Sequence, residues 1–205
     1  MIRIYACSSN AGKLRDFKLV ASEAGFSDFL LEPLPDLKNI EAPEETGTTF
    51  EENASLKALY YSRFVDEIVL ADDSGIAVDA LGGAPGVHSA RYAGTNASDE
   101  ANNDLLLENM VGKIERSARF VCAIALAQQG RILHSISGTV NGEILPAPRG
   151  KCGFGYDPLF FYPPFALSFG EIEDARKFGV SHRGEALRQL IQWAALRDSG
   201  TPGFK

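Results

Sequence analysis

The sequence comprises 205 residues, of which 45% are hydrophobic and 23% are charged, and its formal net charge is -7. This length fits one domain or two closely packed lobes, and it buries enough surface to need no disulfide or structural metal. The negative charge argues against a general nucleic-acid binder, which needs a basic surface, although local cations can still hold a small phosphate ligand.

Strands and helices are predicted to alternate along the first third of the chain. Residues 2–7 form a short, mostly apolar run typical of a buried strand, and residues 29–34 form a second one. Between them, apolar residues recur at helical spacing over residues 14–24, and Gly25 is a helix stop signal.

A second helix is predicted to begin after Thr49, because Thr49 and Glu52 have the spacing of a capping box. Residues 68–71 then form a short apolar strand, and Gly75 is expected to begin a turn soon after it. The apolar residues of the second helix share one face: Phe50, Ala54, Ala58, Tyr61 and Val65.

The second part of the chain contains clustered strands. Ser98 is a suitable cap for a helix that runs to about residue 111. The later predictions are strands at residues 118–127, 132–140 and 143–145, a short helix at 171–177 and a final helix at 185–197. This order predicts an α/β fold with a mixed sheet.

Two adjacent carboxylates, Asp72 and Asp73, carry the strongest chemical signal. Neighbouring side chains on a strand point to opposite faces, so a turn near Gly75 is expected to bring both carboxylates to one site. Side-by-side anions repel, and a divalent cation such as Mg²⁺, which prefers oxygen ligands, offsets that repulsion. The same residues also fit a solvated Asp-Asp-Ser-Gly turn.

Lys57 favours a functional site over a plain turn. It lies on the apolar face of its predicted helix, one turn after Asn53, where a lysine either extends to solvent or serves a buried anion. Glu45 precedes the same helix in a segment dense in metal- and phosphate-binding groups. It is therefore a candidate metal ligand, with an exposed acidic loop as the alternative.

The loop between the first strand and the first helix reads Ser8-Ser9-Asn10-Ala11-Gly12-Lys13. Backbone amides at a helix start, two hydroxyls and a lysine form a suitable phosphate cradle. The spacing is not that of a P-loop, and a plain strand-to-helix turn has the same composition.

Candidate base-binding groups occur late in the chain. The segment GFGYDP combines the rings of Phe154 and Tyr156 with the carboxylate of Asp157. Aromatic rings stack on bases, and a carboxylate accepts hydrogen bonds from base N–H groups. His182 and Arg183 stand together at the start of the last helix. Both segments also fit structural roles.

The three cysteines, Cys7, Cys122 and Cys152, are widely spaced and form no CxxC pair, so neither a disulfide framework nor a zinc site is indicated. A reduced intracellular compartment follows from this. The sequence shows no signal peptide and no window near the ~20 apolar residues of a membrane span. We expect a cytoplasmic protein without membrane or nucleic-acid partners.

Together, these motifs resemble the inosine/xanthosine triphosphate pyrophosphatase family, whose members remove deaminated purine nucleotides. The matching segments are SSNAGK at 8–13, EETGTTFEENASLKA at 44–58, LADDSGIAVDALGGAPGVHSARYAG at 70–94, GFGYDPLFF at 153–161 and SHRGEAL at 181–187. The resemblance implies a single ITPase-like domain over residues 1–205, in which an elongated mixed β-sheet and flanking helices form two lobes around a central cleft. It also implies a homodimer and an Mg²⁺-dependent nucleoside-triphosphate pyrophosphatase that converts ITP, dITP or XTP to the monophosphate and pyrophosphate.

The resemblance also implies a role for each matching residue. Asp73 resembles the general base that activates the attacking water, with Lys57 as the second catalytic residue. The groups that resemble magnesium ligands are Glu45, Asp72 and Asp73. The groups that resemble ligands of the triphosphate are Ser8, Asn10, Lys13 and Lys57, and Ser74 is also expected to bind substrate. The groups that resemble the purine pocket are Phe154, Gly155, Tyr156, Asp157, Lys177, His182 and Arg183, with Arg91 nearby. Donors aimed at a 6-keto oxygen favour inosine and xanthosine, because the 6-amino group of adenine leaves them unpaired.

The chain departs from the family pattern at two places. Cys7 and Ser8 stand where the family usually has Ala-Thr, and residues 166–180 match poorly around Lys177. Two other interpretations stay open. One is a related pyrophosphatase with another base preference, such as modified pyrimidines, and the other is a nucleotide-binding module without catalysis.

Overall fold

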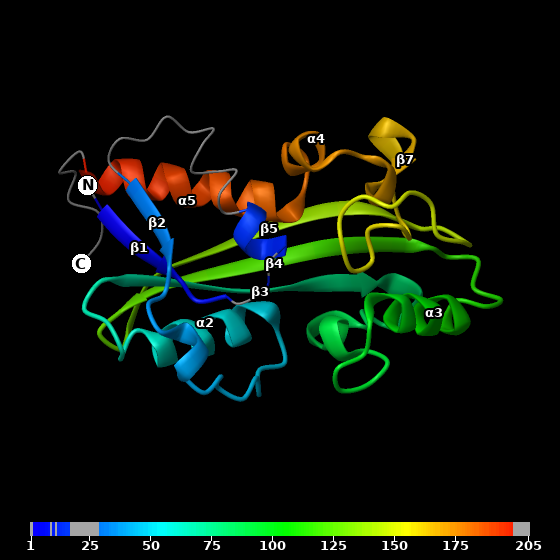
Figure 1. Cartoon of the computed structure of the whole chain (residues 1–205). Helices are drawn as coiled ribbons and strands as arrows, with labels where there is room; N and C mark the ends of the chain where they lie inside the picture. Colours follow the sequence, from blue (N-terminus) through cyan, green and yellow to red (C-terminus); the bar gives the residue numbers. More distant parts are fainter. Residues whose placement is uncertain (1, 9, 11, 17–28, 199–205) are drawn as a thin grey trace. The chain divides into compact units, whose positions relative to one another are not determined.

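The described part of the chain contains seven strands in one mixed sheet (Figure 1). The structure is a computed structural model, and it describes residues 2–8, 10, 12–16 and 29–198. The strands are β1 (Ile2–Ala6), β2 (Phe29–Pro33), β3 (Ile68–Val78), β4 (Ser117–Gln128), β5 (Arg131–Ile144), β6 (Phe160–Tyr162) and β7 (Leu167–Ser168). Their order is β2-β1-β3-β4-β5-β6-β7. β1 pairs in parallel with β2 and β3, whereas β6 pairs antiparallel with β5 and β7, so the predicted mixed sheet is confirmed.

Helices flank these strands, as predicted for the α/β class. The helices are α2 (Phe50–Tyr61), α3 (Asp99–Asn109), α4 (Asp174–Phe178) and α5 (His182–Asp198), with short 3-10 turns η1 (Leu37–Asn39), η2 (Asp79–Leu81), η3 (Gly86–Arg91), η4 (Pro163–Phe165) and η5 (Phe169–Glu171). Residues 12–16 are also helical, whereas the rest of the helix predicted at 14–24, with its stop at Gly25, lies outside the described residues.

The capping residues predicted for α2 and α3 are confirmed at the start of both helices. The Thr49 hydroxyl accepts a hydrogen bond from the Glu52 amide, and the Glu52 carboxylate accepts one from the Thr49 amide, which completes the predicted capping box. Ser98 caps α3 by accepting from the Ala101 amide. α2 ends at Tyr61, so the prediction that Val65 belongs to its apolar face is wrong.

The chain divides into two compact units. Unit 1 contains Met1–Asp73, Ala123–Gly138 and Arg183–Lys205, and unit 2 contains Ser74–Cys122 and Thr139–His182. In unit 1, α2 and α5 lie on opposite faces of the strands (Figure 1). The core of unit 2 gathers Ile76, Val78, Leu106, Met110, Ala118, Phe120, Val140, Ile144, Tyr156, Leu159, Phe160, Phe169 and Ile172. The single domain predicted over residues 1–205 stays a prediction.

The turn predicted near Gly75 is wrong, because β3 runs unbroken from Ile68 to Val78. A side chain at Gly75 would collide with Ser89, whose hydroxyl accepts a hydrogen bond from the Ile76 amide at 2.9 Å. Glycine is therefore required at this position by the close approach of η3, not by a change of chain direction.

Three further element boundaries differ from the predictions. The strand predicted at 143–145 is the end of β5, and α5 begins at His182 instead of residue 185. The helix predicted at 171–177 is divided between η5 and α4.

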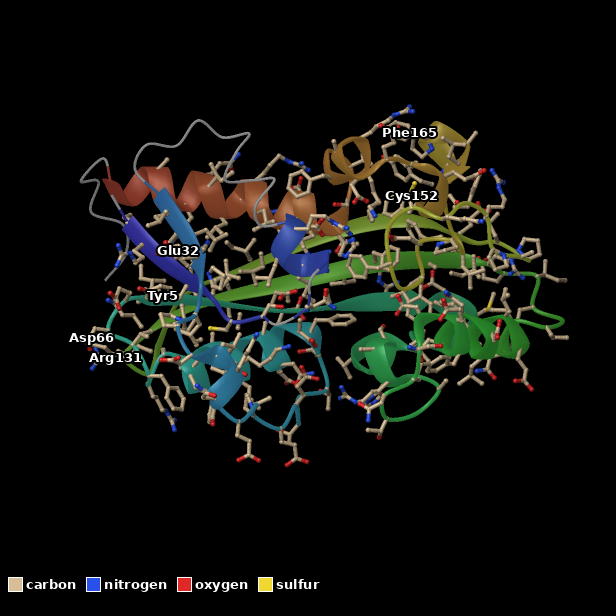
Figure 2. The ribbon with its side chains drawn as sticks, in the orientation of Figure 1. Tyr5, Glu32, Asp66, Arg131, Cys152 and Phe165 are labelled. Atoms are coloured by element: carbon tan, nitrogen blue, oxygen red, sulfur yellow. The ribbon has the colours of Figure 1, made fainter. Side chains whose placement is uncertain are left out.

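Strand β1 is aligned in register with β2, and the three cysteines differ in burial. Tyr5 of β1 and Glu32 of β2 are register partners in unit 1 (Figure 2). Within the described residues the three cysteines form no disulfide with one another; Cys7 and Cys122 are buried, whereas Cys152 is exposed. Among the described residues, no helix combines the length and the apolar character needed to cross a membrane.

Candidate functional site

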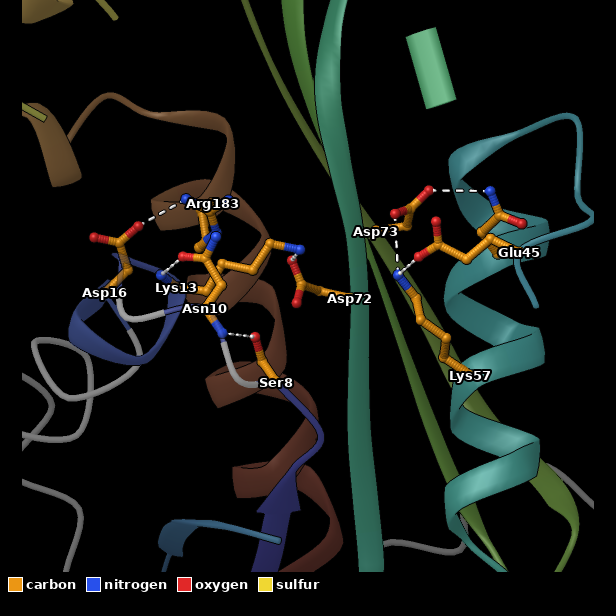
Figure 3. Close-up of polar contacts among 10 residues, drawn as sticks. Ser8, Asn10, Lys13, Asp16, Glu45, Lys57, Asp72, Asp73 and Arg183 are labelled. Atoms are coloured by element: carbon orange, nitrogen blue, oxygen red, sulfur yellow. Dashed lines mark hydrogen bonds and ion pairs between the residues drawn. The ribbon is translucent and has the colours of Figure 1, made fainter. Parts of the chain in front are cut away.

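The continuous strand β3 directs Asp72 and Asp73 to opposite faces (Figure 3). The carboxylate of Asp72 lies 2.7 Å from the ammonium of Lys13. The carboxylate of Asp73 lies 3.0 Å from the ammonium of Lys57, which comes from α2. The expectation that a turn brings both carboxylates to one face is therefore wrong, and each aspartate has a lysine of its own.

The group around Asp73 is built by α2 and the segment before it. Lys57 Nζ contacts Glu45 at 2.8 Å and Asp73 at 3.0 Å, so one ammonium joins two carboxylates (Figure 3). Asn53 is fully buried; its amide donates to Asp73 at 3.3 Å and accepts from the Gly47 backbone N–H at 2.8 Å. A side chain at Gly47 would collide with Asn53, so glycine keeps the segment before α2 close to the site.

Burial and charge set the protonation of this group. Burial is the largest influence on Asp73, and it holds the pKa of the carboxyl above its ordinary value although Lys57 opposes it. Burial lowers the pKa of Lys57, but Asp73 and Glu45 outweigh it, and the pKa lies above its ordinary value. Lys57 is therefore charged at neutral pH, and the group combines two carboxyl groups with one ammonium.

The group around Asp72 lies in unit 1 on the other face of β3. Arg183 at the start of α5 forms a 2.7 Å ion pair with Asp16, and its charge also acts on Asp72 (Figure 3). Burial opposes ionisation of Asp72, but the charges of Lys13 and Arg183 outweigh it and hold its pKa below the ordinary value. Asp72 is therefore an anion that holds Lys13 near the phosphate-suited loop.

In the described residues of that loop, side chains accept hydrogen bonds from nearby backbone N–H groups. The Asn10 backbone N–H donates to the Ser8 hydroxyl at 3.2 Å, and the Lys13 backbone N–H donates to the Asn10 side chain at 3.1 Å. Ser8, Asn10 and Lys13 are thus brought together, as predicted, at the start of the helical residues 12–16.

A separate group in unit 2 gathers three of the predicted purine-pocket residues. The Asp157 carboxylate accepts hydrogen bonds from the Phe154 backbone N–H at 3.0 Å and from Lys177 at 2.8 Å. The buried Lys177 ammonium lies 6.0 Å from the centre of the Phe154 ring. The structure therefore joins Lys177 to the GFGYDP segment, although the sequence around it matches the family poorly.

Two further residues predicted for the purine pocket are held in the core of unit 2. The ring of His182 stacks on Phe120 with centroids 4.8 Å apart and planes at 13°. The Tyr156 hydroxyl donates to the Ser89 carbonyl at 2.7 Å, and burial raises the pKa of this phenol. Tyr156 therefore fixes the segment to η3, and its hydroxyl is committed to that contact.

Three predicted substrate residues lie elsewhere. Ser74 is half-buried on β3, and Arg91 is half-buried at the end of η3. Arg183 belongs to unit 1, where it forms an ion pair with Asp16. Sequence reasoning gave no role to Asp16 and noted Asn53 only for its place one turn before Lys57.

The carboxylate oxygens of Glu45 and Asp73 are suitable ligands for Mg²⁺. Glu45 and Asp73 offer carboxylate oxygens only, and Mg²⁺ takes one or two carboxylates and completes its shell with waters and phosphates. Within the described residues, no three His, Cys, Asp or Glu side chains gather at a common metal position. The predicted set of Glu45, Asp72 and Asp73 is thus not assembled as one group, since Asp72 lies on the far face of β3.

Comparisons with known proteins agree with one another. The model of the Ham1 family matches residues 4–193. A dITP/XTP pyrophosphatase from Acidobacterium capsulatum is 49% identical over 199 residues, which cover 93% of this chain and 97% of the relative. One from Geobacter sulfurreducens is 46% identical, covering 93% of this chain and 95% of the relative.

Solved structures show the same likeness. A HAM1 protein from Coxiella burnetii superposes with a TM-score of 0.85 at 36% identity, covering 97% of this chain and 100% of that one. The Ham1 protein of Staphylococcus aureus superposes with a TM-score of 0.84 at 39% identity and the same coverage.

Proposed function

The chain belongs to the Ham1 family, and from this premise we propose that it is a pyrophosphatase that hydrolyses deaminated purine nucleoside triphosphates. Its substrates are ITP, dITP and XTP, and its products are the nucleoside monophosphate and pyrophosphate. The observation that carries the proposal is the buried group in which Lys57 joins Glu45 and Asp73, because such a group is suited to a metal-bound, negatively charged substrate.

Asp73 is the proposed general base. Asn53 and Lys57 each hold one of its oxygens, and its raised pKa moves the carboxyl toward the range in which a group can accept a proton from water. Asp72 differs, because its ion pair suits it to position Lys13 for the triphosphate.

Magnesium dependence is part of the proposal. Glu45 and Asp73 would hold the ion, which supplies neutralisation of phosphate charge and lowers the pKa of bound water. Lys57 would then be able to donate to a phosphate oxygen. Ser8, Asn10 and Lys13 are proposed to bind the triphosphate, and Phe154, Asp157, Lys177 and His182 to read the base.

The identity of the products tests the reaction type. With ITP as substrate, we expect IMP and pyrophosphate in equal amounts, measured by anion-exchange chromatography. Release of IDP and orthophosphate would show cleavage at another phosphate bond and contradict the proposal.

Metal removal has a definite expected outcome. Dialysis against EDTA is expected to stop ITP hydrolysis, and added Mg²⁺ is expected to restore it, since triphosphate charge is otherwise poorly compensated. Hydrolysis that persists at its full rate in EDTA would contradict the assignment of Glu45 and Asp73.

The variant His182→Ala tests base recognition. We expect it to raise the KM for ITP about tenfold with a smaller change in kcat, because His182 is proposed to contact the base and not the reacting phosphate. His134→Ala is the control, since His134 lies in unit 1 and stacks on Trp193. A fall in kcat with an unchanged KM would contradict this role.

A homodimer, a cytoplasmic location and the absence of nucleic-acid partners complete the proposal, as the family resemblance and the net charge of -7 suggest. Sedimentation velocity tests the dimer. A monomer at micromolar concentration would contradict it.

A further inference from the structure

Helix α3 holds Gly155 through both of its backbone groups. The Gly155 N–H donates to the Asp99 carboxylate at 2.7 Å, and the Gly155 carbonyl accepts from the Asn103 side-chain amide at 3.0 Å. Asp99 and Asn103 are four residues apart on one face of the helix. Two side chains from a distant helix therefore fix the orientation of both peptide groups that flank one glycine.

Gly155 is a position at which the chain needs such support. Its φ of 61° lies in the left-handed region, and so does the φ of 78° at Gly153. A Cβ at Gly155 would meet nothing within 4 Å, so its conformation is not enforced by packing around it. Phe154 stands between these two glycines, and its direction depends on both of them.

Asn103 is buried, and among the described residues only its Nδ2 atom, not its Oδ1 atom, has a hydrogen-bond partner. The side chain is 7% exposed, and its Oδ1 atom has no hydrogen-bond partner within the described residues. A buried acceptor without a partner is unfavourable, and an apolar side chain of similar size would avoid it. The feature of the asparagine that the structure uses is its Nδ2 donor to Gly155.

In the turn formed by residues 153–158, Asp157 is the group that contacts Lys177. Asp157 accepts hydrogen bonds from Phe154 N–H and Lys177, and it is separated from Gly155 by one residue. A change in the Gly155 peptide groups therefore moves Phe154 on one side and Asp157 on the other.

We propose that Asp99 and Asn103 are positioning residues for base recognition, which hold the 153–158 turn so that Phe154 and Asp157 meet the purine. The inference rests on the proposed function and adds residues that lie outside the base-binding segments themselves. The proposal assigns helix α3 a role in specificity for the base.

The first test is the variant Asn103→Asp, which keeps the shape of the side chain but replaces the donor to the Gly155 carbonyl with a carboxylate oxygen that faces it. We expect the KM for ITP to rise about tenfold and kcat to change less than about threefold, as expected for loss of one hydrogen bond that acts on binding. The ratio of kcat/KM for ITP to that for ATP is expected to fall. The inhibition constant of inorganic triphosphate, which lacks a base, is expected to stay unchanged.

The second test uses the exposed Asp99, where substitution does not disturb the core. Asp99→Ala removes the acceptor for the Gly155 N–H and is expected to raise the KM, whereas Asp99→Asn keeps an acceptor and is expected to recover most of the loss. Both variants lose the same charge at the start of α3, so their difference reports the contact itself. Asp104→Asn on the exposed side of α3 is the control.

The two tests distinguish a failure of the positioning role of Asp99 and Asn103 from a failure of the proposed function. If the wild-type protein does not hydrolyse ITP, the proposed function fails. If the wild type prefers ITP over ATP and both Asn103→Asp and Asp99→Ala keep its KM and its preference, the positioning role is wrong. A rise in the inhibition constant of inorganic triphosphate would also overturn it, because it would indicate a general disturbance.

Discussion

Replacement of Asp73 by asparagine is expected to lower kcat for ITP about 10³-fold, within the range that general-base catalysis contributes. The amide keeps the size of the side chain and can still accept from Lys57 or Asn53, so binding of the nucleotide is expected to remain measurable. Steady-state kinetics and calorimetry with a slowly hydrolysed ITP analogue check the two effects separately. Near-normal turnover would refute Asp73 as the base.

Asp72→Asn is the matched control for that variant. Asp72 is the neighbouring residue, but it faces Lys13 on the other side of β3. We expect its substitution to raise KM through a misplaced Lys13 and to lower kcat less than Asp73→Asn does. If both variants lose kcat equally, the division of work between the two faces of β3 is wrong.

Lys57→Met is expected to abolish measurable ITP hydrolysis and to destabilise the protein by about 3 kcal/mol. Breaking a buried ion pair by removing one partner commonly costs ~3–5 kcal/mol, and Lys57 compensates both Glu45 and Asp73 with only 13% of its side chain exposed. Urea unfolding measures this loss. Added Mg²⁺ is expected to stabilise the variant more than the wild type, because the freed carboxylates bind it only in the folded state.

Lys38→Met serves as the control for Lys57→Met. Lys38 is an exposed lysine in η1 of the same unit, and its substitution is expected to change stability by less than ~0.5 kcal/mol. Equal effects of the two substitutions, or no response of the Lys57 variant to Mg²⁺, would contradict the assignment of Glu45 and Asp73 to a metal.

Features that depend on nearby residues could be predicted from the sequence. The capping box at Thr49 and Glu52 sets the start of α2 through contacts over three residues, and the helical face that carries Lys57 follows from spacing alone. The order of the predicted strands and helices already indicated a mixed α/β fold, and the family resemblance is now supported over residues 4–193.

Features that depend on distant residues were missed or misjudged. Gly75 has the local character of a turn, but it lies within the unbroken strand β3, and glycine is required there because Ser89 of η3 comes close. The consequence, opposite faces for Asp72 and Asp73, could not be derived from the local pattern. The contacts of Asn103 with Gly155, 52 residues away in sequence, are likewise formed only by the fold.

The most direct test of the central claim is a panel of nucleoside triphosphates with kcat/KM measured for each. We predict values for ITP, dITP and XTP at least about 10²-fold above those for ATP and the standard pyrimidine nucleotides, because a site built to hydrogen-bond a 6-keto group strongly rejects substrates without it. A preference for modified pyrimidines would favour the related pyrophosphatase with another base preference. Binding of ITP without turnover would indicate a nucleotide-binding module, and equal values for ITP and ATP would contradict the claim.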